Sequence, residues 1–66
     1  MEVDALMTKP HGIIAIFFRE DRFYPIQFMG LKPAREEAED HAVLNPGVTR
    51  IEDTHGRILW KAGTVQ

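Results

Sequence analysis

The 66-residue sequence contains no cysteine and no serine. A chain without cysteine forms neither disulfides nor thiolate metal sites, and such a composition suits a reducing compartment. A chain that lacks both residues also lacks the usual nucleophiles of acyl transfer. The glycines stand singly, so the sequence carries neither a phosphate-binding loop nor a dinucleotide fingerprint. We therefore expect a protein that is not an enzyme and needs no cofactor.

Positive charge and long apolar runs are scarce as well. Eight Lys and Arg stand against ten Asp and Glu, for a net charge of −2, so no positive field attracts nucleic acid or an anionic membrane. No segment approaches the ~20 apolar residues that span a bilayer. Residues 1–10 carry acidic side chains where a signal peptide carries basic ones. We expect a soluble, cytoplasmic protein without a membrane partner.

The residues that are present indicate one small α+β domain over residues 11–62. The segment 1–10 is weakly patterned and is expected to be flexible, and residues 63–66 are expected to form a loose tail. Runs rich in β-branched and aromatic residues predict strands, and an alanine-rich stretch predicts a helix. The predicted order is ββαββ, with strands at about 12–19, 23–29, 48–53 and 57–61 and a helix at about 33–44.

The first predicted strand contains IIAIFF at 13–18, which is apolar on both sides, and it should lie in the centre of the sheet. Pro25 has no N–H to donate, so the second strand should be an edge. A right-handed crossover through the helix places the third strand beside the first. The sequence therefore predicts a four-stranded antiparallel sheet of order 2-1-3-4, with one helix packed on one face.

Proline and glycine mark the predicted turns. Pro33 suits the first helical position, and Pro46 stops the helix at Asn45 and continues into an NPG turn. The sequence DTHG at 53–56 predicts a short hairpin loop with Gly56 in the left-handed region. That loop predicts that Glu52 lies opposite Ile58, Ile51 opposite Leu59 and Arg50 opposite Trp60. The predicted apolar stripe of the helix comprises Ala34, Ala38, His41 and Ala42, extended by Leu44 or Asn45.

One helix covers one face of such a sheet and leaves the other uncovered. A half-solvated antiparallel strand alternates apolar and polar residues, which the first strand does not do. Because large exposed apolar patches mark interaction sites, we expect a homodimer, packed face to face or by exchange of an edge strand or of the N-terminal segment. The predicted interface comprises Ile14, Ile16, Phe18, Ile58 and Trp60. If the helix instead covers the face that carries these residues, the interface would comprise Ile13, Phe17, Ile51 and Leu59.

Other occupants of the uncovered face are open at this point. The terminal segments would fold back over it through Val3, Leu6, Met7 or Val65, or a different protein would bind there. A single-stranded nucleic acid would stack on sheet aromatics, for which the sequence offers Trp60, Phe17 or Phe18, and Tyr24.

The helix and the second hairpin offer two weaker chemical sites. Glu37 and His41 are four residues apart on one helix face and are candidates for a metal site, with His55, Asp53 or His11 as a third ligand. Asp53 and His55 suggest an acid/base pair, but turn chemistry explains the same residues without catalysis.

Overall fold

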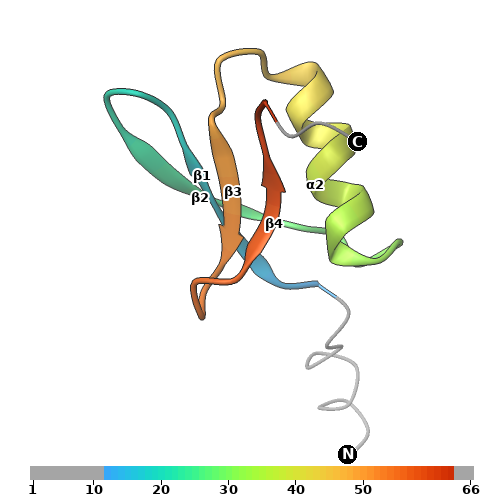
Figure 1. Ribbon diagram of the computed structural model, residues 1–66. Coiled ribbons are helices and arrows are strands. Elements are labelled where there is room, and N and C mark those ends of the chain that lie inside the picture. The colour runs from blue at the N-terminus through green and yellow to red at the C-terminus, as the bar shows by residue number, and fades with distance from the viewer. Residues whose placement is uncertain (1–11, 64–66) are drawn as a thin grey trace, which may run out of the picture.

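The computed structural model describes residues 12–63. The predicted flexible segment 1–10 and residues 64–66 of the predicted tail lie outside the described residues. The elements in chain order are β1 (Ile14–Phe18), β2 (Phe23–Gln27), α2 (Ala34–Leu44), β3 (Arg50–Asp53) and β4 (Ile58–Lys61) (Figure 1). The strands form one antiparallel sheet of order β2-β1-β3-β4. The predicted fold class and strand order are confirmed.

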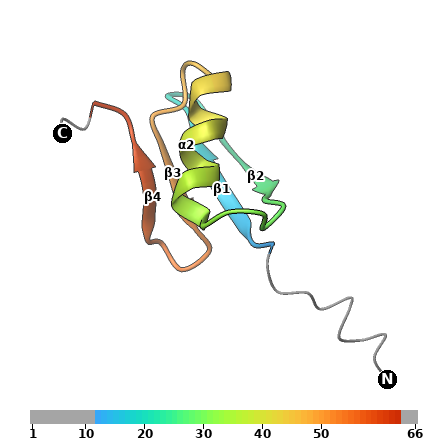
Figure 2. The same ribbon diagram turned by 90° about the vertical axis from the view of Figure 1, so that its right-hand side faces the viewer.

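Helix α2 lies across one face of the sheet, and Figure 2 shows it in front of the strands. Phe17 of β1 is buried beneath it and contacts three other rings: Tyr24 at 5.9 Å, Phe28 at 6.1 Å and His41 at 5.7 Å between centroids. Offset and edge-to-face ring pairs at such distances stabilise a core beyond the area that they bury. Aromatic side chains of β1, β2 and α2 therefore join the helix to the sheet.

Small residues let the helix approach the sheet closely. Ala38 and Ala42 of α2 are buried, as are Ala15 and Ile51 on the facing strands. An alanine adds little bulk between two backbones, so the larger rings can fill the remaining space. The predicted stripe of alanines is confirmed at Ala38 and Ala42.

The two ends of α2 follow the local sequence. Pro33 was expected at the first helical position, but it lies one residue before it, and the helix begins at Ala34. Glu36 and Glu37 lie in the first turn, where the helix dipole favours acidic groups. At the other end the Asn45 amide donates to the carbonyl of His41 at 2.7 Å. Of the two residues predicted as alternatives to extend the stripe, Leu44 is 77% exposed, so that alternative is wrong, whereas Asn45 is half-buried. Leu44 follows the buried Ala42 by two residues, which is about 200° around the axis of an α-helix, so its side chain points away from the sheet.

The β3–β4 hairpin departs from the predicted register. Glu52 lies opposite Ile58 as expected, but Ile51 pairs with Trp60 and Arg50 with Lys61. The predicted pairs Ile51–Leu59 and Arg50–Trp60 are wrong, because Leu59 is an extra residue that forms a β-bulge. The bulge places Trp60 on the face of the buried Ile51, under the helix.

We expect Ala38→Leu to lower the free energy of unfolding by about 1–3 kcal/mol, because no space remains for a larger side chain between α2 and the sheet. The matched control is Ala62→Leu, at an exposed position, which should change stability little. Urea denaturation followed by circular dichroism measures both. Equal midpoints for the two variants would contradict the close helix–sheet packing.

Candidate protein interface

The face of the sheet turned away from α2 gathers four of the five predicted interface residues. Ile14, Ile16 and Phe18 alternate with the buried Ala15 and Phe17 along β1, so they point to the uncovered side. Ile58 joins them from β4 and is 42% exposed, and Ile14 is 39% exposed. We call this side of the sheet the open face. The fifth residue, Trp60, is not on it. The alternative set of Ile13, Phe17, Ile51 and Leu59 belongs to the core or packs against it.

The open face is ordered in two adjacent rows that run across all four strands. Strand pairing aligns Phe23, Phe18, Arg50 and Lys61 in one row. It aligns Pro25, Ile16, Glu52 and Ile58 in the next row. Each row is apolar on β2 and β1 and carries a charged side chain on β3, and the first row carries a second one, Lys61, on β4. The apolar part of the open face therefore lies mainly over β1 and the edge strand β2.

Arg50 partly covers the apolar part of this face. Its guanidinium carbon lies 3.7 Å from the centroid of the Phe18 ring, and its Nε donates to Glu52 Oε2 at 2.6 Å. A guanidinium on an aromatic face at such a distance makes a cation–π contact. Phe23 lies edge-on to the same ring at 5.7 Å and is itself 59% exposed. Phe18 is therefore partly shielded, whereas Phe23 remains open to solvent.

Sequence reasoning missed the Arg50–Phe18 contact because it placed Arg50 opposite Trp60. The signal was present in the spacing: Arg50 and Glu52 are two residues apart, so they share a face of β3 whatever the partner strand does. The strand beside β3 then decides which aromatic ring Arg50 meets. That strand is β1, which pairs Phe18 with Arg50.

Both edges of the sheet carry features that oppose pairing with another strand. On β2, Pro25 interrupts the row of N–H donors. The other edge, β4, is four residues long, contains the bulge at Leu59 and ends on Lys61. Short, bulged and lysine-bearing edges are the devices by which native sheets avoid edge-to-edge association. The geometry therefore favours contact through the open face over addition or exchange of a strand.

The aromatic residues that the sequence offered for nucleic-acid stacking do not form one platform. Phe17, Tyr24 and Trp60 pack against the core on the helix side, whereas Phe18 is on the opposite face of the sheet. Trp60 lines a shallow groove between α2 and β4, together with Arg35, Glu39 and Leu59. A base that stacked on Trp60 would not reach Phe18.

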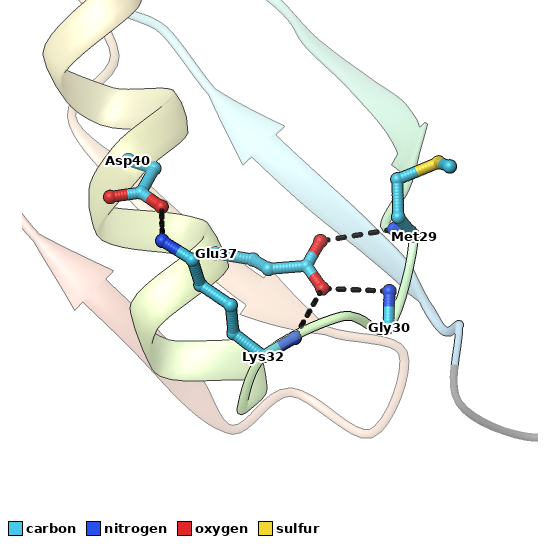
Figure 3. A network of polar contacts seen from close by, with 5 residues as sticks. All are labelled: Met29, Gly30, Lys32, Glu37 and Asp40. Atoms are coloured by element: carbon cyan, nitrogen blue, oxygen red, sulfur yellow. Dashed lines mark hydrogen bonds and ion pairs between the residues drawn. The ribbon is translucent and has the colours of Figure 1, made fainter.

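Glu37 holds the loop between β2 and α2. Its carboxylate is buried and accepts backbone hydrogen bonds from Met29 at 3.0 Å, Gly30 at 2.7 Å and Lys32 at 3.5 Å (Figure 3). Burial opposes ionisation, but the backbone N–H groups, led by that of Gly30, hold the pKa of Glu37 below its usual value. The ammonium group of Lys32, in the same loop, pairs with Asp40 of α2 (Figure 3). Glu37 thus has a structural role that sequence reasoning missed.

His41 and Glu37 do not act as a metal-binding pair in this geometry. The His41 ring stacks on Phe28 with 5.0 Å between centroids and lies edge-on to Phe17, and the Glu37 carboxylate is engaged by the loop. No group of three or more metal-ligating side chains occurs within residues 12–63. The third ligand considered from the sequence, His11, lies outside that range.

The second hairpin shows turn chemistry at Asp53. Its carboxylate accepts the backbone N–H of His55 at 2.8 Å and that of Arg57 at 2.9 Å, and Gly56 has a φ of 84°. The hydrogen bond from Arg57 is the main cause that lowers the pKa of Asp53. The loop is exposed at His55, so it offers no pocket for acid/base chemistry. The predicted left-handed Gly56 is confirmed.

Comparison with known proteins assigns no family to this geometry. No protein-family model, curated protein or solved structure matches the chain. In the part of the chain that the structure describes, no helix has the length and apolar character needed to cross a bilayer. The functional argument is therefore based on the chain itself.

We expect acid to destabilise the fold partly through Glu37. Because its pKa in the folded chain is below the usual 4.5, the ionised carboxylate contributes stability above pH 4.5 and loses it as the pH falls through the lowered value. Glu37→Gln should therefore have a lower urea midpoint than the native chain at pH 7, and the gap should narrow at pH 3. The control Glu39→Gln, on the exposed surface of the same helix and beyond its first turn, should follow the native chain at both pH values. A gap for Glu37→Gln that is the same at pH 7 and pH 3 would contradict this role.

Proposed function

We propose that the protein is a non-enzymatic interaction module that forms a homodimer through the open face of its sheet. One observation carries the proposal: β1 is apolar on both sides, and α2 covers only the side of Ala15 and Phe17. Ile14 and Phe23 remain 39% and 59% exposed near Ile16, and Ile58, which is 42% exposed, lies beyond Glu52 on β4. Contiguous exposed apolar groups of this kind mark binding surfaces.

The charges of the open face favour a second copy as the partner. Arg50 and Glu52 lie side by side on β3, so the face presents both signs. A copy of the same face can then oppose each charge with its counterpart, as the self-complementary contact of a two-fold dimer requires. A nucleic-acid partner would instead need a basic surface, which the net charge of −2 and the Arg50–Glu52 pair do not supply.

The size of the face predicts the strength of the association. Four strands about 4.8 Å apart, two of five residues and two of four, at ~3.3 Å per residue, make a sheet face of roughly 300 Å² in projection. Stable interfaces bury about 800 Å² of accessible surface on each partner. We therefore propose a weak, concentration-dependent homodimer in place of a permanent one. We also propose that the module acts in the cytoplasm, because its dimer is held by packing and needs no disulfide.

We expect the native chain to shift from the mass of one chain to that of two as its concentration rises from micromolar to millimolar. Phe23→Lys should weaken the association by about tenfold or more, because it places a charge on the open face at a position exposed enough to leave folding intact. Sedimentation equilibrium measures both. The matched control is Val43→Lys, at a 74% exposed apolar position on the helix, and it should associate like the native chain.

Two results would overturn the dimer. One is a single-chain mass at millimolar concentration, which would leave the open face without a second copy. The other is equal weakening by Phe23→Lys and Val43→Lys, which would place the contact elsewhere. Salt-dependent binding of single-stranded RNA by the native chain, lost in Phe23→Lys, would instead support the nucleic-acid alternative.

A further inference from the structure

We propose that the two copies meet with their strands antiparallel, so that Arg50 of each chain lies opposite Glu52 of the other. The two-fold axis would then run perpendicular to the strands and pass between the two rows of the open face. This inference rests on the proposed homodimer and defines its geometry. It follows from strand register and charge.

The register of the sheet makes one such axis satisfy several contacts together. Rotation about an axis midway between the two rows lays each strand over its own copy and each row over the other row. Arg50 then meets Glu52 of the second copy, Phe18 meets Ile16, and Phe23 meets Pro25. Apolar side chains therefore face apolar side chains over β1 and β2, and opposite charges face each other over β3. Over the edge strand β4, Lys61 meets Ile58, and Lys61 is exposed enough to keep its ammonium in water.

A two-fold axis parallel to the strands fails the same test. Such an axis lays each row on itself. The Glu52 carboxylate would then face a second Glu52 or one of the apolar members of its row, Pro25, Ile16 and Ile58. Two carboxylates repel each other, and a carboxylate buried against apolar groups loses its hydration without a partner. The charges therefore select the perpendicular axis.

Arg50 can serve its own chain and the second copy at once. Only Nε is used in its bond to Glu52 of the same chain, and a guanidinium carries further donors on its two terminal nitrogens. The Arg50 side chain is 40% exposed and that of Glu52 is 19% exposed. A paired Arg50 would keep its contact with Phe18 and extend a terminal nitrogen to the Glu52 of the second copy.

Charge reversal tests the contact between chains separately from the contact within a chain. Arg50→Glu gives a homodimer with only acidic groups at these positions, and Glu52→Arg gives one with only basic groups. Each alone should associate about tenfold more weakly than the native chain, because like charges oppose each other. An equimolar mixture should form a heterodimer in which every pair is opposite in charge, with an affinity close to the native value.

The control uses an ion pair away from the open face. Lys32→Glu and Asp40→Lys reverse the exposed pair on the helix side, and their mixture should show no preference for the heterodimer. Sedimentation equilibrium with one chain fluorescently labelled measures all mixtures. A native dimer whose Arg50→Glu and Glu52→Arg variants mix without preference would overturn the antiparallel arrangement and leave the homodimer in place. A native chain that stays single would overturn both.

A second measurement keeps the inference testable if a reversed variant does not fold. The chain has no cysteine, so His55→Cys at the exposed hairpin tip gives one site for a spin label. In the antiparallel dimer the two tips point to opposite ends and lie ~25 Å or more apart, since each is about four residues from the axis. An axis along the strands would put both tips at one end, separated mainly by the ~10 Å between packed sheets. A distance near the shorter value would overturn the proposal.

Discussion

The main constraint on the structure is that β1 carries large apolar side chains on both faces, and both faces must be kept from water. Among the strands within residues 12–63, β1 alone has both a neighbour on each edge and large apolar side chains on each face. The helix side is closed by packing, with Phe17 in contact with rings from β2 and α2. The other side is closed only in part, by the guanidinium of Arg50 over Phe18. The difference between the two closures separates the core of the domain from the open face, which is the surface that we propose for association.

The sequence was sufficient to predict most of the fold because its strongest signals are local. The doubly apolar run at 13–18, the edge proline at Pro25 and the turns at NPG and DTHG each determine one element or connection. Strand order followed from the handedness of the crossover. These signals agree with one another, and such agreement is typical of sequences that specify one fold.

Three features could not be predicted from the sequence because they depend on contacts between residues far apart in the chain. The bulge at Leu59 carries no local signal, since no glycine or proline marks it, and it moved Trp60 from the open face to the core side. The sequence suggested Glu37 as a candidate metal ligand beside His41, but the β2–α2 loop folds onto its carboxylate. The position of Arg50 over Phe18 could be predicted only after the neighbour of β3 and its register were known.

The contact of Arg50 with Phe18 affects how the free monomer interacts with other molecules. An arginine side chain can pack its apolar stem against an aromatic ring and keep its guanidinium group in water. Such a contact reduces nonspecific hydrophobic association of the monomer. In the proposed homodimer, the fraction of paired chains would then depend on the local protein concentration.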